Sequence, residues 1–223
     1  GDTHQGGIVF WLDGNGGGLI ASPVDQSNGT SWGCFGTSIS GAYGTTIGTG
    51  SQNTISIEAG CTTPATAADL CANYTDGTYS DWFLPSQDEL NEMYSNLYQQ
   101  GLGGFTNSSY WSSTEFNNLY ARVQYFPNGS QGYTTKESTL YNVRAVRAFG
   151  NMTLYGCTDS SQFNYNPSAN TDDGSCIAVV NGCTDPLYTE YDPLANTNDG
   201  SCATLIVNGC TDSTALNYNT AAN

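Results

Sequence analysis

The feature that most constrains this chain is a repeat in its last third. The tetrapeptide Gly-Cys-Thr-Asp begins at positions 156, 182 and 209, so successive copies are 26 and 27 residues apart. A second pattern, ending in Asp-Gly-Ser-Cys, supplies Cys176 and then Cys202. Repeats this short cannot bury a core of their own, so the spacing predicts disulfides Cys157–Cys176 and Cys183–Cys202. Each closes a loop of about 20 residues, which stabilises the fold by about 3 kcal/mol in the chain-entropy model.

The cysteines also indicate where the protein resides. Eight cysteines at regular spacings are typical of an oxidising compartment. No apolar run approaches the roughly 20 residues of a membrane span, so we expect no membrane insertion. The sequence starts at Gly1 without a signal peptide, and we interpret it as a mature or excised piece of an exported, cell-surface protein. The third repeat stops before its second cysteine, so Cys210 lacks a mate and we expect the natural chain to continue.

The repeats are rich in oxygen-bearing side chains that end in a glycine turn. Calcium takes six to eight oxygen ligands, and this spacing predicts calcium binding, although the distal glutamate of a helix–loop–helix site is missing. The predicted ligands are Asp159, Asn166, Asn170, Asp172 and Asp173 in one repeat and Asp185, Asp192, Asn196, Asn198 and Asp199 in the next. The alternative is that Asn and Asp cap turns while the disulfides hold each repeat together.

Residues 1–150 have a different composition and contain the main predicted helix. Ser86 and Glu89 form a capping box, in which each side chain accepts a hydrogen bond from the backbone N–H of the other residue. Gly101 is expected to end the helix in a left-handed conformation. Its apolar face recurs at helical spacing through Leu90, Met93, Tyr94, Leu97 and Tyr98.

The rest of this region is predicted to form strands and loops. A hairpin is expected from 8–12 and 19–21, followed by strands at 110–115, 120–126 and 141–149. One helix among several hairpins predicts an α+β fold. A long segment, 22–78, has a possible short helix at 66–73. It holds Cys34, Cys61 and Cys71, one pair of which is expected to form a disulfide whose partners the spacing leaves open.

Four motifs, which follow one another along the chain, together resemble those of a known domain family. They are Gly6-Gly7-Ile8-Val9-Phe10, Asp81-Trp82-Phe83-Leu84-Pro85-Ser86 with Glu89-Leu90, Tyr110-Trp111-Ser112-Ser113-Thr114, and Val143-Arg144-Ala145-Val146-Arg147. Together they resemble the domain family named after the C-terminal domain of the Legionella collagen-like adhesin. The resemblance covers about residues 5–149. The repeats are similar to those of secreted Bacteroidetes proteins and, more loosely, to thrombospondin type 3 calcium repeats.

The resemblance implies a C-type lectin-like fold with paired N- and C-terminal strands, and a surface role in adhesion or ligand binding. The sequence departs from the family at two positions. Phe83 stands where arginine is usual, and Ala145 stands where many members have cysteine, so Cys71 is expected to find another partner. The namesake recognises sulfated polysaccharide, whereas a net charge of −16 argues against that ligand class here.

Binding is expected in loops on a rigid scaffold. The predicted ligand-binding residues are Glu115, Asn117, Asn118, Tyr120, Asn128, Gln131, Tyr133 and Lys136. Trp82 and Trp111 are interpreted mainly as core residues. Arg144 and Arg147 are expected to pair with acidic neighbours such as Asp81 or Glu89.

The predicted function is an extracellular adhesin module that binds a glycan or a surface protein. Its domains are a lectin-like domain at 1–150, repeats at 151–181 and 182–208, and a truncated repeat at 209–223. The alternative is a structural subunit that forms homo-oligomers in a filament or layer. Twenty acidic residues against four basic ones argue against nucleic-acid partners. Catalysis is not expected, because the one histidine, His4, has no accompanying nucleophile motif.

Overall fold

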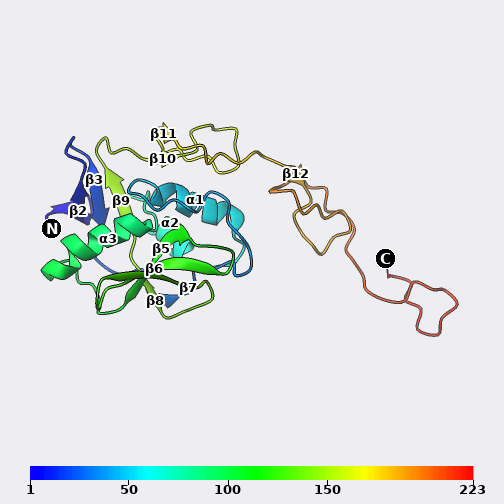
Figure 1. Cartoon of the computed structure of the whole chain (residues 1–223). Coiled ribbons are helices and arrows are strands. Elements are labelled where there is room, and N and C mark those ends of the chain that lie inside the picture. The colour runs from blue at the N-terminus through cyan, green and yellow to red at the C-terminus, as the bar shows by residue number, and fades with distance from the viewer. Residues whose placement is uncertain (223) are drawn as a thin grey trace. The chain divides into compact units, whose positions relative to one another are not determined.

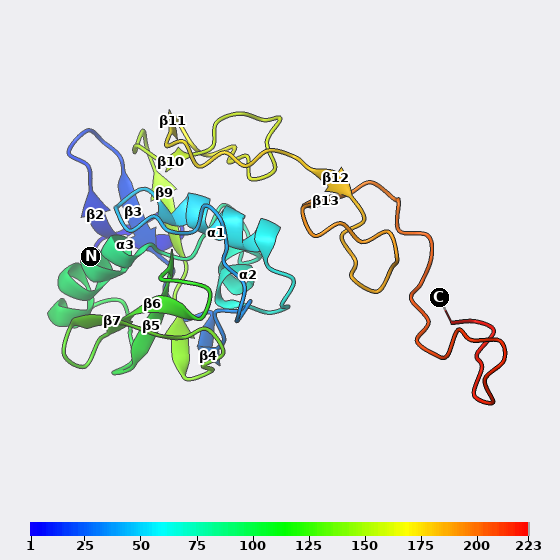
Figure 2. The same ribbon diagram turned by 45° about the vertical axis from the view of Figure 1, so that its right-hand side comes forward.

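The computed structural model describes residues 1–222. The chain forms two compact units, Gly1–Ile177 and a second unit that begins at Ala178. The sequence placed a boundary at residue 150, whereas the first unit also includes the first repeat. Within this unit, the strands form a four-stranded sheet and a five-stranded sheet, and the helices lie beside them (Figures 1 and 2).

The smaller sheet joins the two ends of the first domain. It contains β1 (Thr3–His4), β2 (Gly7–Leu12), β3 (Gly18–Ala21) and β9 (Val146–Phe149), in that order. The predicted hairpin is confirmed as β2 and β3, and Asp13 Oδ1 caps its turn by accepting from Asn15 N and Gly17 N. β3 also pairs antiparallel with β9. The expected pairing of N- and C-terminal strands is therefore present.

The larger sheet has the order β4 (Ser27–Thr30), β8 (Tyr141–Val143), β5 (Ser109–Glu115), β6 (Tyr120–Tyr125) and β7 (Ser130–Thr135). Its neighbours pair antiparallel except for β5 and β8. The sequence predicted one last strand over 141–149, but the structure divides it. Because the chain crosses from one sheet to the other at Arg144–Ala145, β8 and β9 belong to different sheets.

The main predicted helix is confirmed as α3 (Gln87–Asn96), followed by the 3₁₀ turn η1 (Tyr98–Gln100). Its capping box is present: Ser86 Oγ accepts from Glu89 N at 3.3 Å, and Ser86 N donates to Glu89 Oε2 at 2.8 Å. Gly101 ends this segment in the left-handed region, with φ of 70°.

Glu89 has a second role that the sequence did not reveal. Its buried Oε1 also accepts from Gly48 N at 2.8 Å and Gly50 N at 3.4 Å, at the start of helix α1 (Gly50–Gly60). A Cβ at position 50 would lie 2.2 Å from Glu89 Oε2, so this approach requires glycine. Burial raises the pKa of Glu89 to about 7, while the N–H donors act in the opposite direction.

Helix α1 was missed from the sequence, whereas α2 (Ala67–Ala72) lies within the short helix expected at 66–73. α1 has no apolar stripe because its buried side chains are mostly polar. They include Ser51, Gln52, Asn53, Thr54 and Ser56. Periodicity of apolar residues therefore gives no signal for this helix.

The interpretation of Trp82 and Trp111 as core residues is confirmed. Trp82 and Trp111 are buried, with 3% and 0% exposure. Phe83, at the position where the family usually has arginine, is buried beside Leu90 and Val146 in an apolar cluster. An apolar residue at position 83 therefore fits its surroundings.

The cysteines of the domain pair as Cys34–Cys61. The expectation that Cys71 has a partner is wrong. It is a free thiol with no exposed surface in the apolar core, and burial raises its pKa well above the ordinary value. Ala145 belongs to the same buried cluster.

The repeats share one local architecture. Each of the first two contains a short parallel pair, β10 (Tyr155–Gly156) with β11 (Thr171–Asp172), and β12 (Asn181–Gly182) with β13 (Thr197–Asn198). The disulfides are Cys157–Cys176 and Cys183–Cys202, the two pairs named from the sequence. Asn170 and Asn196 make matching contacts, since the side-chain Oδ1 accepts from the N–H of Leu154 and of Val180.

The first repeat lies against α1 (Figures 1 and 2). The carboxamide of Gln52 reaches into the repeat, where Oε1 accepts from Cys157 N at 2.9 Å and Nε2 donates to Asn164 O at 3.1 Å. In the second and third repeats, the backbones of the corresponding residues instead form isolated parallel β-bridges, Cys183 with Tyr191 and Cys210 with Tyr218. Gln52 thus occupies a place that the other repeats fill with their own backbone.

We expect Glu89→Gln to lower the free energy of unfolding by about 1–3 kcal/mol, because an amide NH₂ would replace an oxygen that faces backbone donors. Urea unfolding monitored by circular dichroism measures the change. Glu92→Gln, on the same helix, is the control and should have little effect. Equal stability of the two variants would contradict the role assigned to Glu89.

We expect Gln52→Leu to destabilise the first unit by about 1–3 kcal/mol, because Cys157 N–H and Asn164 C=O would lose their partner in a buried site. The measurement is thermal unfolding together with limited proteolysis, in which cleavage between 151 and 177 should become faster. Gln100→Leu, at an exposed position, controls for the change in side-chain chemistry. Unchanged proteolysis would show that Gln52 does not hold the repeat.

Candidate ligand-binding site

An exposed aromatic cluster lies on the β6–β7 face of the larger sheet. We call Phe116, Tyr120, Arg122 and Tyr133 the aromatic platform. The rings of Phe116 and Tyr133 stack with centroids 4.4 Å apart and planes 10° apart, and Tyr120 meets Tyr133 edge-on at 5.6 Å. The three rings are 41%, 36% and 51% exposed for Phe116, Tyr120 and Tyr133.

Strand alternation brings these side chains together. Arg122 of β6 lies opposite Tyr133 of β7, and Tyr120 lies one pair further along the same face. The intervening Ala121 and Val123 point into the core, where both are buried. Phe116 follows β5, in a turn closed by hydrogen bonds from Phe116 N and Asn117 N to Tyr120 O. The platform thus has a rigid β-hairpin beneath it.

The platform contains a cation, Arg122, that forms no ion pair within residues 1–222. The Arg122 guanidinium carbon lies 4.5 Å from the Phe116 ring centroid and 5.9 Å from that of Tyr133. The other three cations form ion pairs, Lys136 with Glu115, Arg144 with Asp25, and Arg147 with Asp81. Among the lysines and arginines of residues 1–222, Arg122 is therefore the one left for contact with a ligand.

The family of the Lcl C-terminal domain matches residues 24–147, a range that contains the whole platform. This chain belongs to the Lcl C-terminal domain family. No curated protein matches the chain. Membership marks it as an adhesin-like surface protein. The three disulfides within residues 1–222 fit an oxidising location. In residues 1–222, no helix combines the length and apolar composition needed to cross a membrane.

Tyr120 and Tyr133, both predicted from the sequence, are part of the platform of this Lcl domain. Asn117 and Asn118 lie in the turn beside it. Asn117 Oδ1 accepts from Leu119 N and Tyr120 N, so that oxygen shapes the turn, while Asn118 is exposed. Asn118 is the better placed of the two to contact a ligand.

Asn128 and Gln131 lie towards the other end of the β6–β7 hairpin. Asn128 Oδ1 caps the turn through Ser130 N and Ser130 Oγ. Gln131 exchanges hydrogen bonds with Gln87 at the start of α3. Gln131 is exposed and lies two residues from Tyr133, at the edge of the platform.

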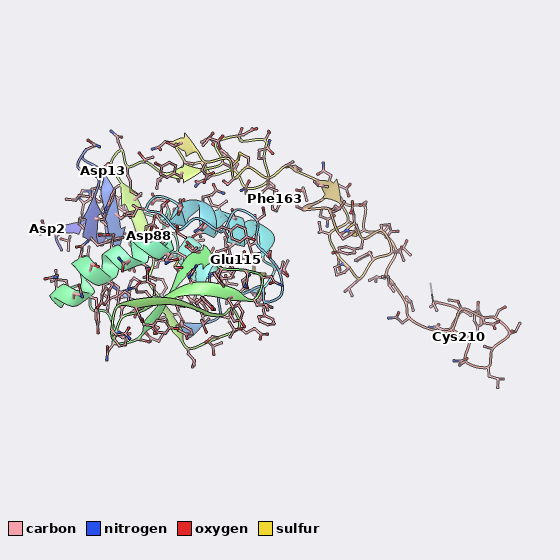
Figure 3. The ribbon with its side chains drawn as sticks, in the orientation of Figure 1. Asp2, Asp13, Asp88, Glu115, Phe163 and Cys210 are labelled. Atoms are coloured by element: carbon pink, nitrogen blue, oxygen red, sulfur yellow. A yellow bond between two sulfur atoms is a disulfide. The ribbon has the colours of Figure 1, made fainter. Side chains whose placement is uncertain are left out.

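Glu115, labelled in Figure 3, and Lys136 do not belong to an accessible site. Both side chains are fully buried, with Lys136 Nζ 3.1 Å from Glu115 Oε1. Lys136 also donates to Thr37 O, and Glu115 accepts from Ile39 N. Burial raises the pKa of Glu115 and lowers that of Lys136. The pair anchors the 37–39 loop to the sheet, a role that sequence alone did not separate from ligand binding.

Sequence reasoning missed Phe116 and Arg122 as site residues. The alternation of Tyr120, Arg122 and Gln124 against apolar neighbours already placed Arg122 on the solvent face. Its stacking depends on Phe116, which comes from a turn whose path the sequence did not define. The available signal was therefore the strand alternation alone, which placed Arg122 on the solvent face.

Of the arginines expected to pair with Asp81 or Glu89, Arg147 does bond to Asp81. Arg144 instead bonds to Asp25 at 2.6 Å, and Glu89 binds backbone N–H groups. His4 is exposed, and its ring lies 4.6 Å from that of Phe149.

The predicted calcium ligands all accept hydrogen bonds from backbone N–H groups within residues 151–208. Asp159, Asp172, Asp173, Asp185, Asp192, Asn198 and Asp199 each accept through Oδ1 from the backbone N–H two residues later. Asn166 does the same and is buried, and Asn170 and Asn196 bond to the backbone sixteen residues earlier.

The carboxylates of the repeats do not gather into a cluster within residues 1–222. In residues 1–222, no three His, Cys, Asp or Glu side chains converge on a common point that suits a metal. Calcium prefers six to eight convergent oxygens, whereas here each side chain shapes its own turn. Calcium binding thus stays a prediction from the sequence, and turn capping accounts for the same residues.

A melting experiment distinguishes calcium binding from turn capping. If the Asp and Asn side chains act as turn caps, EDTA should leave the melting temperature unchanged, while reduction of the disulfides should lower it, since each is worth about 3 kcal/mol. We expect this result. Calorimetry in calcium, in EDTA and in a reducing agent measures it. A fall in EDTA that added calcium reverses would instead establish metal binding.

Proposed function

We propose that this protein is an extracellular adhesin module that binds a glycan or protein ligand through the aromatic platform. The observation that carries the proposal is the exposed stack of Phe116 and Tyr133. Large aromatic side chains usually bury most of their surface, and these two keep 41% and 51% exposed on a rigid hairpin. Such a surface is suited to contact with a partner.

The chemistry of the platform favours a neutral or weakly charged glycan. The C–H face of a sugar ring can bury apolar surface against Tyr133 and Phe116. Asn118, Gln131 and the hydroxyl of Tyr120 can bond to sugar hydroxyls. Densely sulfated chains would meet one unpaired cation, Arg122, on a protein with a net charge of −16. Electrostatic repulsion therefore argues against them.

The architecture supports a C-type lectin-like fold as part of this proposal. The β3–β9 pairing of the chain ends is the feature that the family resemblance implied. The disulfide-linked repeats that begin at Ala178 would serve as a spacer. We propose no catalytic role for the domain.

Self-assembly is the second candidate, and the same surface favours it. Tyrosine and arginine are the residues that most often dominate the energy of protein interfaces, and the platform contains Tyr120, Tyr133 and Arg122. A homo-oligomer built through this surface would be a structural subunit of a filament or layer. Light scattering of the wild-type protein and of platform variants distinguishes this from glycan binding.

A glycan array tests the proposal. We expect Phe116→Ala and Tyr133→Ala each to weaken binding of a hit at least tenfold, because each removes half of the stack. Tyr43→Ala, at an aromatic residue 49% exposed outside the platform, is the matched control and should bind normally. Binding that survives both platform changes would overturn the assignment of the site. No hit, together with discrete oligomers lost on Tyr133→Ala, would favour self-assembly.

A further inference from the structure

A pocket lies between the domain and the first repeat. It shares no residue with the aromatic platform. Its volume is about 440 Å³, within the range of small-molecule sites. Its apolar wall comes from Ile55 and Ala59 of α1, Ala72 of α2, and the adjacent Trp82 and Phe83. Ser168 of the first repeat also lines it. The pocket is therefore built from both the domain and the repeat.

Trp82, which lines this pocket, has an unused hydrogen-bond donor. Its side chain is 3% exposed, and among residues 1–222 its buried indole N–H has no acceptor. The other buried tryptophans differ, because Trp32 Nε1 donates to Ser112 O at 2.9 Å and Trp111 Nε1 donates to Thr30 O at 2.8 Å. Buried donors without a partner are rare in native proteins. A ligand that carries an acceptor into an apolar pocket would explain this one.

The rim of the pocket is polar. Glu58, Asp81 and Ser168 line it and are exposed at the surface. Burial and the neighbouring Asp69 raise the pKa of Glu58 to about 7, so near neutral pH its carboxyl group can donate as well as accept. Such a rim suits hydroxyl groups. With a net charge of −16, the protein is unsuited to an anionic ligand.

We propose that this pocket binds the acetamido group of an N-acetylated amino sugar. The acetyl methyl would pack against Ile55, Ala59 and Ala72, and the acetyl oxygen would accept from the Trp82 indole N–H. The sugar hydroxyls would meet the polar rim. The first repeat would then complete a binding site through Ser168. This proposal does not depend on the aromatic platform.

Titration of the whole chain with N-acetylglucosamine tests the proposal, using calorimetry and saturation-transfer NMR. We expect the strongest transfer at the acetyl methyl and no binding of glucose, which has a hydroxyl in place of the acetamido group. Trp82→Phe removes the N–H and should weaken binding at least tenfold. Because this change could unfold the core, Ala59→Leu provides a second variant that fills the pocket from a half-buried helix position.

Tyr133→Ala is the matched control, since it alters the platform and should keep N-acetylglucosamine binding. Both pocket variants should retain any glycan-array hit that depends on the platform, so failure of one site is distinguishable from failure of the other. Equal binding of glucose would overturn the proposal, as would full binding by folded Trp82→Phe and Ala59→Leu. Binding of N-acetylalanine methylamide without N-acetylglucosamine would overturn the assignment to a sugar.

Discussion

The buried carboxylate of Glu89 is the interaction on which much of the domain depends. Its oxygens accept from Ser86 N at the start of α3 and from Gly48 N and Gly50 N at the start of α1. The N-termini of two helices carry partial positive charge, and one carboxylate stabilises both. Because α1 in turn holds the first repeat through Gln52, a single side chain connects the main helix to the repeat region.

The crossing of the chain between sheets is the second element of the scaffold. At the crossing, Arg144 is buried and donates to Asp25 Oδ1, Ser22 O and Gly103 O. A buried cation is tolerated only when its donors are satisfied, and here they tie three distant segments together. This connection fixes β8 beside β5. The larger sheet, which presents the aromatic platform, is thereby joined to the sheet that contains the chain ends.

The first repeat shows how a small module can become part of a domain. Its disulfide and its Asn and Asp turn caps make it locally ordered, as in the second repeat. It differs in having Met152 and Leu154 buried in the domain core and in accepting the Gln52 carboxamide. The repeated motif in the sequence therefore does not reveal which copy is a spacer. That depends on whether a complementary surface, here α1, lies within reach.

The sequence by itself determined the local features. The capping box at Ser86, the hairpin at 8–21, the left-handed Gly101 and the repeat disulfides each follow from residues close together in the chain, so their physics is local. Tertiary structure decided what depends on distant partners. It buried Glu115 against Lys136, left Cys71 unpaired, divided the last strand, and formed α1 around polar contacts that leave no apolar periodicity. It also stacked Phe116 on Tyr133, because a turn and a strand seventeen residues apart meet only in the folded sheet.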